Sequence, residues 1–327
     1  MYMVEKSKRL SVFRTSSSSG NSFRMRAIGL FRLSCVIICF GLGVFLNSCE
    51  RKEKIKIPFG YDPEFDYLAV LRSGSAYAYE PTNDYPELTY QDHADEKLVE
   101  LKNRYNLDSV AGTGDELARI LNLFNWVHDE ISHDGGNSTP DPENSLSILD
   151  YCRETDKGVN CVYMAIVFNE ACLSMGFKSR VIHGNAKKFI FNGEWHTFNA
   201  VYSSALDKWI FLDPMKRAYF MDENNNLLSI AEIRQFLIEG KPLLINPEAD
   251  YNGLSFDKNE YLHYLTKNFY RFSCSVESKF NNYGMFHLTG VTRNYVHLDP
   301  GGEPQDGLGV ATNCCTSNPD YFWARPE

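Results

Sequence analysis

The chain lacks the patterns by which several kinds of site are recognised in a sequence. Its nine cysteines include no Cys-x-x-Cys pair and no Cys/His spacing typical of zinc, so we expect no metal site and no cofactor. His128 and His133 are spaced i, i+5, not i, i+4 as in a zinc-binding pair on a helix. No Asp-x-Asp-x-Asp-Gly loop is present, which argues against calcium, and no internal repeat is found.

The sequence also lacks an apolar run long enough to span a membrane. Leu33–Leu46 carries no charge, but its fourteen residues fall short of the roughly 20 that a spanning helix needs. The run follows a basic segment and precedes Leu46-Asn47-Ser48-Cys49, an arrangement typical of a secretory signal. These last four residues resemble a bacterial lipobox, the motif at which signal peptidase cuts and the cysteine is diacylated. A core helix or an uncleaved anchor are the alternatives.

We therefore predict that residues 1–48 are a signal peptide and that Cys49 carries a lipid in the bacterial cell envelope, on a periplasmic or outer-membrane leaflet. Met25 is an alternative start, because the stretch before it is unusually long for a signal peptide. The charged residues after Cys49 do not indicate which membrane leaflet holds the lipid anchor.

Positive charge is scarce in the rest of the chain. Residues 1–48 hold seven Lys and Arg against one Glu, whereas residues 49–327 hold 26 Lys and Arg against 41 Asp and Glu. An acidic body argues against a nucleic-acid partner, because neutralising phosphates requires a basic surface.

The remaining chain divides by composition and periodicity. Residues 49–114 are predicted to be a lipidated tether and an N-terminal extension, residues 115–245 a core domain, and residues 246–327 a C-terminal extension. Helical spacing of apolar residues is found at 96–104, 115–133, 145–154, 230–239 and 259–272. Alternating patterns typical of strands are found at 178–184, 195–202 and 208–212, with a strand, turn and strand at 219–228.

One further helix is predicted between Asn160, a suitable N-cap, and Gly176, a suitable stop. Cys161 would occupy its first turn, where the helix dipole lowers the pKa of a thiol. A nucleophilic thiol also needs an imidazole to share its proton and a carboxylate to orient that imidazole. His196 opens one predicted strand and Asp213 ends the next.

The two strands are close enough in sequence to form a hairpin. A two-residue turn at Ser204-Ala205 would set His196 opposite Asp213 and stack Phe198 on Phe211. Ser-Ala is a poor type I′ turn, however, so a longer loop and a slipped register stay open.

At these residues the sequence resembles the transglutaminase-like superfamily, over roughly residues 115–242. The resemblance rests on four motifs: Gly158-x-x-Cys161, Gly176-Phe-x-x-Arg180-Val-x-x-Gly184, His196-x-Phe198-Asn199-x-Val-Tyr and Trp209-x-x-x-Asp213-Pro. Phe198 departs from the family, which often has Trp there. The ending, from Asn318 to Pro326, resembles tails of lipoproteins of the Bacteroides group.

The resemblance implies an α+β, papain-type core in which a catalytic helix packs on an antiparallel sheet, with Cys161, His196 and Asp213 as a catalytic triad. It implies thiol-dependent acyl transfer on a peptide, protein or other amide-containing substrate, most simply hydrolysis by a cysteine peptidase or amidase. A cross-linking transglutaminase, a non-catalytic peptide- or glycan-binding module and a structural envelope protein are the alternatives.

Other residues are candidates for roles at the same site. The backbone N–H of Cys161 is a natural oxyanion donor, and a second donor is expected from an upstream side chain that the sequence does not identify. His183 is an alternative base that lacks a following carboxylate, and Cys172 is interpreted as a buried apolar residue. Residues 297–300 are predicted to be a surface turn. The tryptophans are core aromatics by default, or line the cleft: Trp126, Trp195 and Trp209.

Overall fold

The computed structural model describes residues 60–74, 76–79, 85–138, 140–188, 195–282, 295–301 and 314–327. All of them belong to the unit Lys54–Glu327. The predicted signal peptide and Cys49 lie outside the described residues. Within the described ranges, no helix has both the length and the apolar character needed to cross a membrane.

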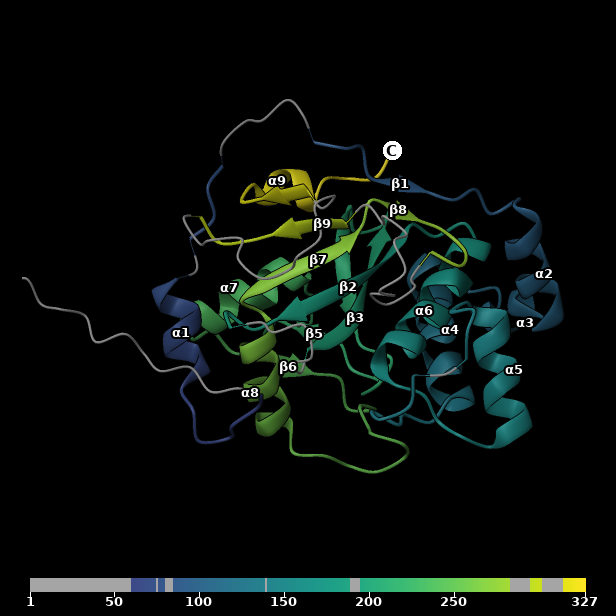
Figure 1. The fold of residues 1–327 in the computed structure, drawn as a ribbon, viewed down its shortest axis with the longest axis horizontal. Coiled ribbons are helices and arrows are strands. Elements are labelled where there is room, and N and C mark those ends of the chain that lie inside the picture. The colour runs from purple at the N-terminus through teal and green to yellow at the C-terminus, as the bar shows by residue number, and fades with distance from the viewer. Residues whose placement is uncertain are drawn as a thin grey trace, which may run out of the picture. The chain divides into compact units, whose positions relative to one another are not determined.

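A six-stranded sheet in the order β10-β9-β7-β2-β3-β4 forms the middle of this unit (Figure 1). Neighbouring strands are antiparallel, except that β9 and β10 are parallel. Their bounds are β2 Ser179–Asn185, β3 His196–Ser203, β4 Lys208–Leu212, β7 Arg271–Ser275, β9 Tyr295–Leu298 and β10 Cys314–Thr316. Strands from residues 246–327 therefore continue the sheet that β2, β3 and β4 begin.

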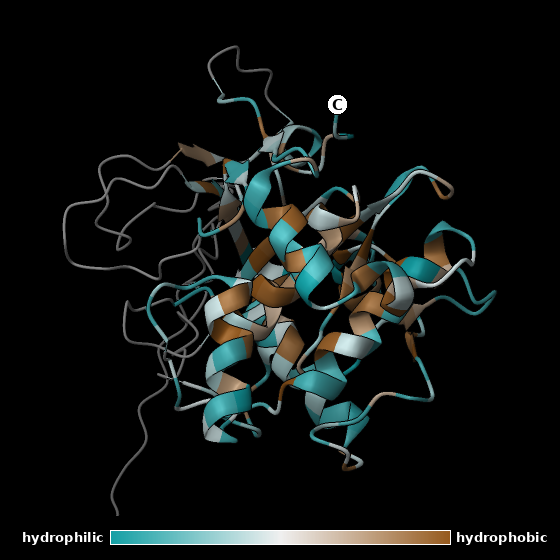
Figure 2. Cartoon of the chain, turned by 90° about the vertical axis from the view of Figure 1, so that its right-hand side faces the viewer, coloured by the Kyte–Doolittle hydropathy of each residue, from teal (hydrophilic) through white to brown (hydrophobic). Residues whose placement is uncertain are grey.

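Side-chain alternation gives the sheet two apolar faces. Val181, Val201 and Ile210 point to one core, which is shared with helices α3 (Leu107–Ala111), α4 (Glu116–Glu130), α5 (Ser145–Thr155) and α6 (Cys161–Ser174). Ile182 and Phe211 point to the other core, shared with α7 (Ile230–Glu239), α8 (Lys258–Asn268) and α9 (Pro319–Phe322). Figure 2 shows hydrophobic residues where the helices meet and hydrophilic residues on their outer turns. The result is a sheet covered by helices on both faces.

The remaining elements are short. They are α1 (Tyr67–Ser73), β1 (Thr89–Tyr90), α2 (Glu96–Arg104), β5 (Phe220–Met221), β6 (Leu244–Ile245) and β8 (Glu277–Ser278). β1 pairs with β8 in parallel, and β5 pairs with β6. The expected second strand of 219–228 is reduced to an isolated bridge between Met221 and Leu227.

The sequence prediction for α6 is confirmed in detail. Asn160 is the N-cap, and its side chain accepts hydrogen bonds from the backbone N–H groups of Val162 and Tyr163. Every residue of the helix after Cys161 is buried, as expected for a helix that is apolar on all sides. Gly176, with φ 81°, follows the helix end in the left-handed conformation that glycine adopts most readily. Cys161 is therefore placed at the half-buried start of an otherwise buried helix.

The β3–β4 hairpin has the longer loop, and its register differs by two residues from the one that a two-residue turn would give. Ser203 pairs with Lys208, so the loop is Ser204–Asp207, in which Asp207 has φ 49°. This longer loop replaces the unfavourable Ser-Ala turn. Because side chains alternate with a period of two, a shift of two keeps His196 and Asp213 on the same face. They meet diagonally instead of directly across the ladder.

Two other predictions are wrong near the C-terminus. Residues 297–300 are not a surface turn, because His297 and Leu298 lie in β9 and are buried. The helix expected at 259–272 ends at Asn268, and the chain then enters β7 at Arg271. Apolar residues that continue the helical spacing at Phe269 and Phe272 instead fill the second core, so tertiary packing overrides the local pattern.

Candidate active site

Cys161, His196 and Asp213 meet where the start of α6 approaches β3 and the end of β4. The side chain of Cys161 is half-buried, and His196 lies close enough to lower the pKa of its thiol. The Nε2 atom of His196 lies 2.6 Å from Oδ2 of Asp213, and both side chains are buried. Since Nε2 is occupied by the carboxylate, Nδ1 is the ring nitrogen left to face the thiol. The imidazole is thus held between a sulfur and a carboxylate.

The protonation of these groups is coupled. Burial raises the pKa of Cys161, but hydrogen bonds and charge from His133 and His196 outweigh it and lower the pKa to about 6. Burial likewise opposes the charged form of His196, yet the Asp213 carboxylate and Cys161 raise its pKa. Burial opposes ionisation of Asp213 too, and His196 and Tyr261 still hold its pKa below the ordinary value. A thiolate beside an imidazolium is therefore favoured near neutral pH.

Helix α8 also supports the carboxylate. The Tyr261 hydroxyl donates to Oδ2 of Asp213 at 2.5 Å, and the backbone N–H of Met215 donates to Oδ1 at 3.0 Å. The Tyr264 ring lies against His196, with ring centroids 5.5 Å apart. Asp213 thus accepts from three donors, which fix its position and favour its ionised form. Neither tyrosine is marked by a sequence motif, because their helix lies about fifty residues beyond Asp213.

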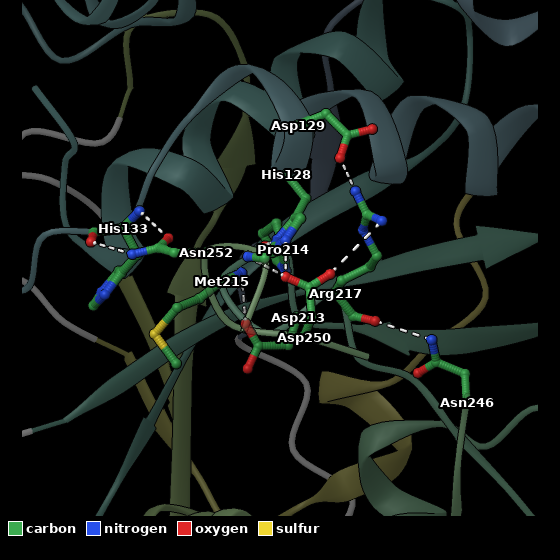
Figure 3. Close-up of polar contacts among 11 residues, drawn as sticks. His128, Asp129, His133, Asp213, Pro214, Met215, Arg217, Asn246, Asp250 and Asn252 are labelled. Atoms are coloured by element: carbon green, nitrogen blue, oxygen red, sulfur yellow. Dashed lines mark hydrogen bonds and ion pairs between the residues drawn. The ribbon is translucent and has the colours of Figure 1, made fainter. Parts of the chain in front are cut away.

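A polar network braces the turn after Asp213 (Figure 3). His128 on α4 contacts the carbonyl of Pro214 through Nδ1 at 2.8 Å and Oδ1 of Asp250 through Nε2 at 2.9 Å. Arg217 forms ion pairs with Asp129 and Asp250. The turn that carries Asp213 is therefore tied to both α4 and the segment before α8.

His133 is the functional candidate that sequence reasoning missed. Its side chain lies close enough to Cys161 to lower the pKa of the thiol, and its Nδ1 lies 2.9 Å from the Tyr251 hydroxyl. Two hydrogen bonds with the Asn252 side chain hold its backbone (Figure 3). In the sequence, the one notable feature of His133 is its spacing from His128, which does not fit a zinc pair. A bridge to Val159, two residues before Cys161, is what brings it to the site.

The other candidates lie elsewhere. The Nδ1 atom of His183 lies 2.9 Å from the Thr197 hydroxyl, and burial lowers the pKa of His183 to about 4. Cys172 is fully buried, and burial raises its pKa. Trp209 packs over the Arg180 guanidinium, 4.1 Å from its ring centre, in the second core. Trp126 packs partly buried against the first core, and the Trp195 carbonyl accepts from the Tyr264 hydroxyl.

Neither a disulfide nor a metal centre is found in the described part of the chain. Its six cysteines are all free. Over the same residues, no group of three or more His, Cys, Asp or Glu side chains is arranged to hold a metal ion.

Comparison with known proteins gives a family for the core. Residues 103–214 match the model of the transglutaminase-like superfamily, so this segment is a transglutaminase-like domain. The match includes His133, Cys161, His196 and Asp213 and ends before Tyr251 and the residues that follow it.

Solved structures and curated sequences add little to this. A crystal structure described as "a Putative Cysteine Protease from Cytophaga hutchinsonii" aligns with 53% of this chain and 64% of that one, which is less than two thirds of its length. The identity is 15% and the TM-score 0.28. No curated protein sequence matches the chain significantly.

Proposed function

We propose that this protein is a thiol-dependent hydrolase of peptide or other amide bonds, with Cys161, His196 and Asp213 as its catalytic triad. The observation that carries the proposal is the chain of contacts from the Cys161 thiol to His196 and from His196 to a buried carboxylate 2.6 Å away. A binding module or a structural protein has no need of an oriented imidazole beside a thiol whose pKa is lowered.

The groups have complementary roles in such a reaction. The Cys161 thiolate attacks the carbonyl carbon, a C–S bond forms, and the carbonyl oxygen becomes an oxyanion. The backbone N–H of Cys161, at the start of α6, is placed to donate to that oxyanion. His196 then gives its Nδ1 proton to the departing amine as the C–N bond breaks. Water deprotonated by the same imidazole releases the acyl group and regenerates the thiol.

Hydrolysis is proposed over transfer to an amine because water is the more abundant acceptor. Peptides, proteins and other amides of the bacterial envelope are the proposed substrates.

Alkylation of Cys161 tests whether the thiol is activated. With the Cys161 pKa lowered to about 6, the reactive thiolate is depleted below that pH and is nearly fully formed at pH 7. We expect the rate of reaction with iodoacetamide to rise as the pH rises through about 6 and then to level off. Mass spectrometry of the labelled peptides gives the rate for each cysteine.

Cys172 on the same helix is the internal control. It is fully buried and burial raises its pKa, so it should stay unlabelled across this range. A Cys161 that alkylates no faster than an ordinary thiol, with a midpoint above pH 8, would remove the proposal.

We also propose that the protein is anchored to the bacterial envelope through a lipid on Cys49. The support is the sequence from Leu33 to Cys49, which lies outside the described residues. Expressed in a bacterium that processes lipoproteins, the wild-type chain should partition with membranes. Cys49→Ser should release it or leave it unprocessed, as fractionation and intact mass would reveal. A wild-type chain found in the cytoplasmic fraction would contradict the anchor.

A further inference from the structure

His133 is held beside Cys161 by a local structure built for close approach. Val159 donates its N–H to the Ser132 carbonyl at 3.0 Å, and its own carbonyl accepts from the N–H of Asp134 at 2.8 Å. A Cβ atom at Gly158 would lie 2.4 Å from the Ser132 carbonyl oxygen, so only glycine permits this contact. The segment that carries His133 is therefore hydrogen-bonded, backbone to backbone, to the residues that precede Cys161.

The C-terminal segment completes this support. Asn252, with φ 51°, accepts from the His133 N–H at 2.8 Å and donates to the His133 carbonyl at 3.0 Å. The neighbouring Tyr251 contacts Nδ1 of the ring at 2.9 Å, and the two rings pack with centroids 5.5 Å apart. Backbone and ring are thus fixed by two consecutive residues that lie beyond the family match.

These contacts decide which ring atom faces the thiol. Tyr251 occupies Nδ1, which leaves Nε2 as the ring nitrogen available to face Cys161. A tyrosine hydroxyl that donates to Nδ1 leaves Nε2 as the ring atom that carries a hydrogen. His196 presents the opposite arrangement, because Asp213 holds its Nε2 and leaves Nδ1 for the thiol. Asp213 stabilises the cation of His196, whereas the Tyr251 hydroxyl orients His133 as a hydrogen-bond donor.

We propose that His133 is a second catalytic residue, which donates its Nε2–H to the oxyanion formed when Cys161 attacks a substrate carbonyl. The assignment rests on the proposed acyl-transfer function and supplies the second oxyanion donor that the sequence could not identify. When the C–S bond forms, the carbonyl π electrons move to oxygen, and this charge is shared by the Cys161 N–H and the His133 Nε2–H. When the carbonyl reforms, those electrons return and the leaving group departs, so no proton is transferred from His133.

Two small probes of Cys161 separate this role from others. p-Nitrophenyl acetate acylates the thiolate through an oxyanion and releases a phenolate that needs no acid, whereas iodoacetamide alkylates it without forming an oxyanion. In the full-length protein, His133→Ala should lower the acylation rate by about 10²–10³-fold, the usual effect of losing one oxyanion donor. The alkylation rate on its high-pH plateau, where the thiol is fully ionised, should change little. His133→Gln, which keeps an N–H donor, should recover part of the acylation rate.

Each other outcome would overturn the assignment. An unchanged acylation rate in His133→Ala would show that the imidazole is not a donor. An equal fall in the acylation and alkylation rates would show that His133 acts on the thiol itself. Circular dichroism of each variant verifies that it is folded before the rates are compared. Slow reaction of the wild-type Cys161 with both probes would overturn the proposed function, and the His133 role with it.

Discussion

Cys161→Ala is expected to abolish amide hydrolysis and to leave the fold intact. The nucleophile and its base act as a unit, so removing the thiol should lower kcat by about 10⁶-fold, as the loss of a nucleophile does in serine proteases. The cost in stability should be small, because Cys161 is half-buried at the first position of α6 and Asn160 caps that helix without it. Turnover of a peptide library by the purified variant, together with its thermal unfolding, measures both effects.

The matched control lies eleven residues along the same helix. Cys172 is fully buried in the first core, so Cys172→Ala should destabilise the protein by leaving a cavity and should preserve turnover per folded molecule. An electrophilic peptide library should leave its covalent adduct on Cys161 in the wild-type chain and in Cys172→Ala. Hydrolysis that persists in Cys161→Ala would rule out the thiol mechanism.

The sequence predicted the local structure around the site well, because the signals there are local. The cap at Asn160, the apolar run of α6 and the alternating strands each come from neighbouring residues, and they carry Cys161, His196 and Asp213 to the same edge of the sheet. Parity along the strands also put His196 and Asp213 on one face, although the register was off by two. Alternation specifies the face, whereas the loop specifies the register.

The supporting residues could not be predicted, because each reaches the site through long-range packing. Tyr261 touches Asp213 across 48 positions of sequence, and Tyr251 touches His133 across 118. Both follow Pro242, where the motif resemblance had ended. The strands that continue the sheet come from the same part of the chain. The C-terminal segment therefore builds the site together with the transglutaminase-like domain, although no motif marks its contribution.

Asp213→Ala is expected to lower turnover by about 3 × 10⁴-fold, as the loss of the triad aspartate does in a serine protease. Without the carboxylate, the His196 Nε2–H has no acceptor, its ring is free to turn, and the imidazolium that pairs with the thiolate loses its counter-charge. Asp213→Asn should lose less. Its amide oxygen can still accept from His196, but its NH₂ group then faces the N–H of Met215, so one of three donors stays unpaired.

Tyr261→Phe is the matched control for this prediction, since it removes one donor to Asp213 and leaves the carboxylate bonded to His196 and Met215. It should lower turnover far less than Asp213→Ala. The competing view is that Asp213 only closes its turn, through Met215 and the bridge to Ala218. In that case the Asn and Ala variants would lose stability, and their folded fraction would work at the wild-type rate. Turnover per folded molecule, counted by titrating the alkylatable Cys161 thiol, separates the two, and wild-type turnover in Asp213→Ala would exclude the orienting role.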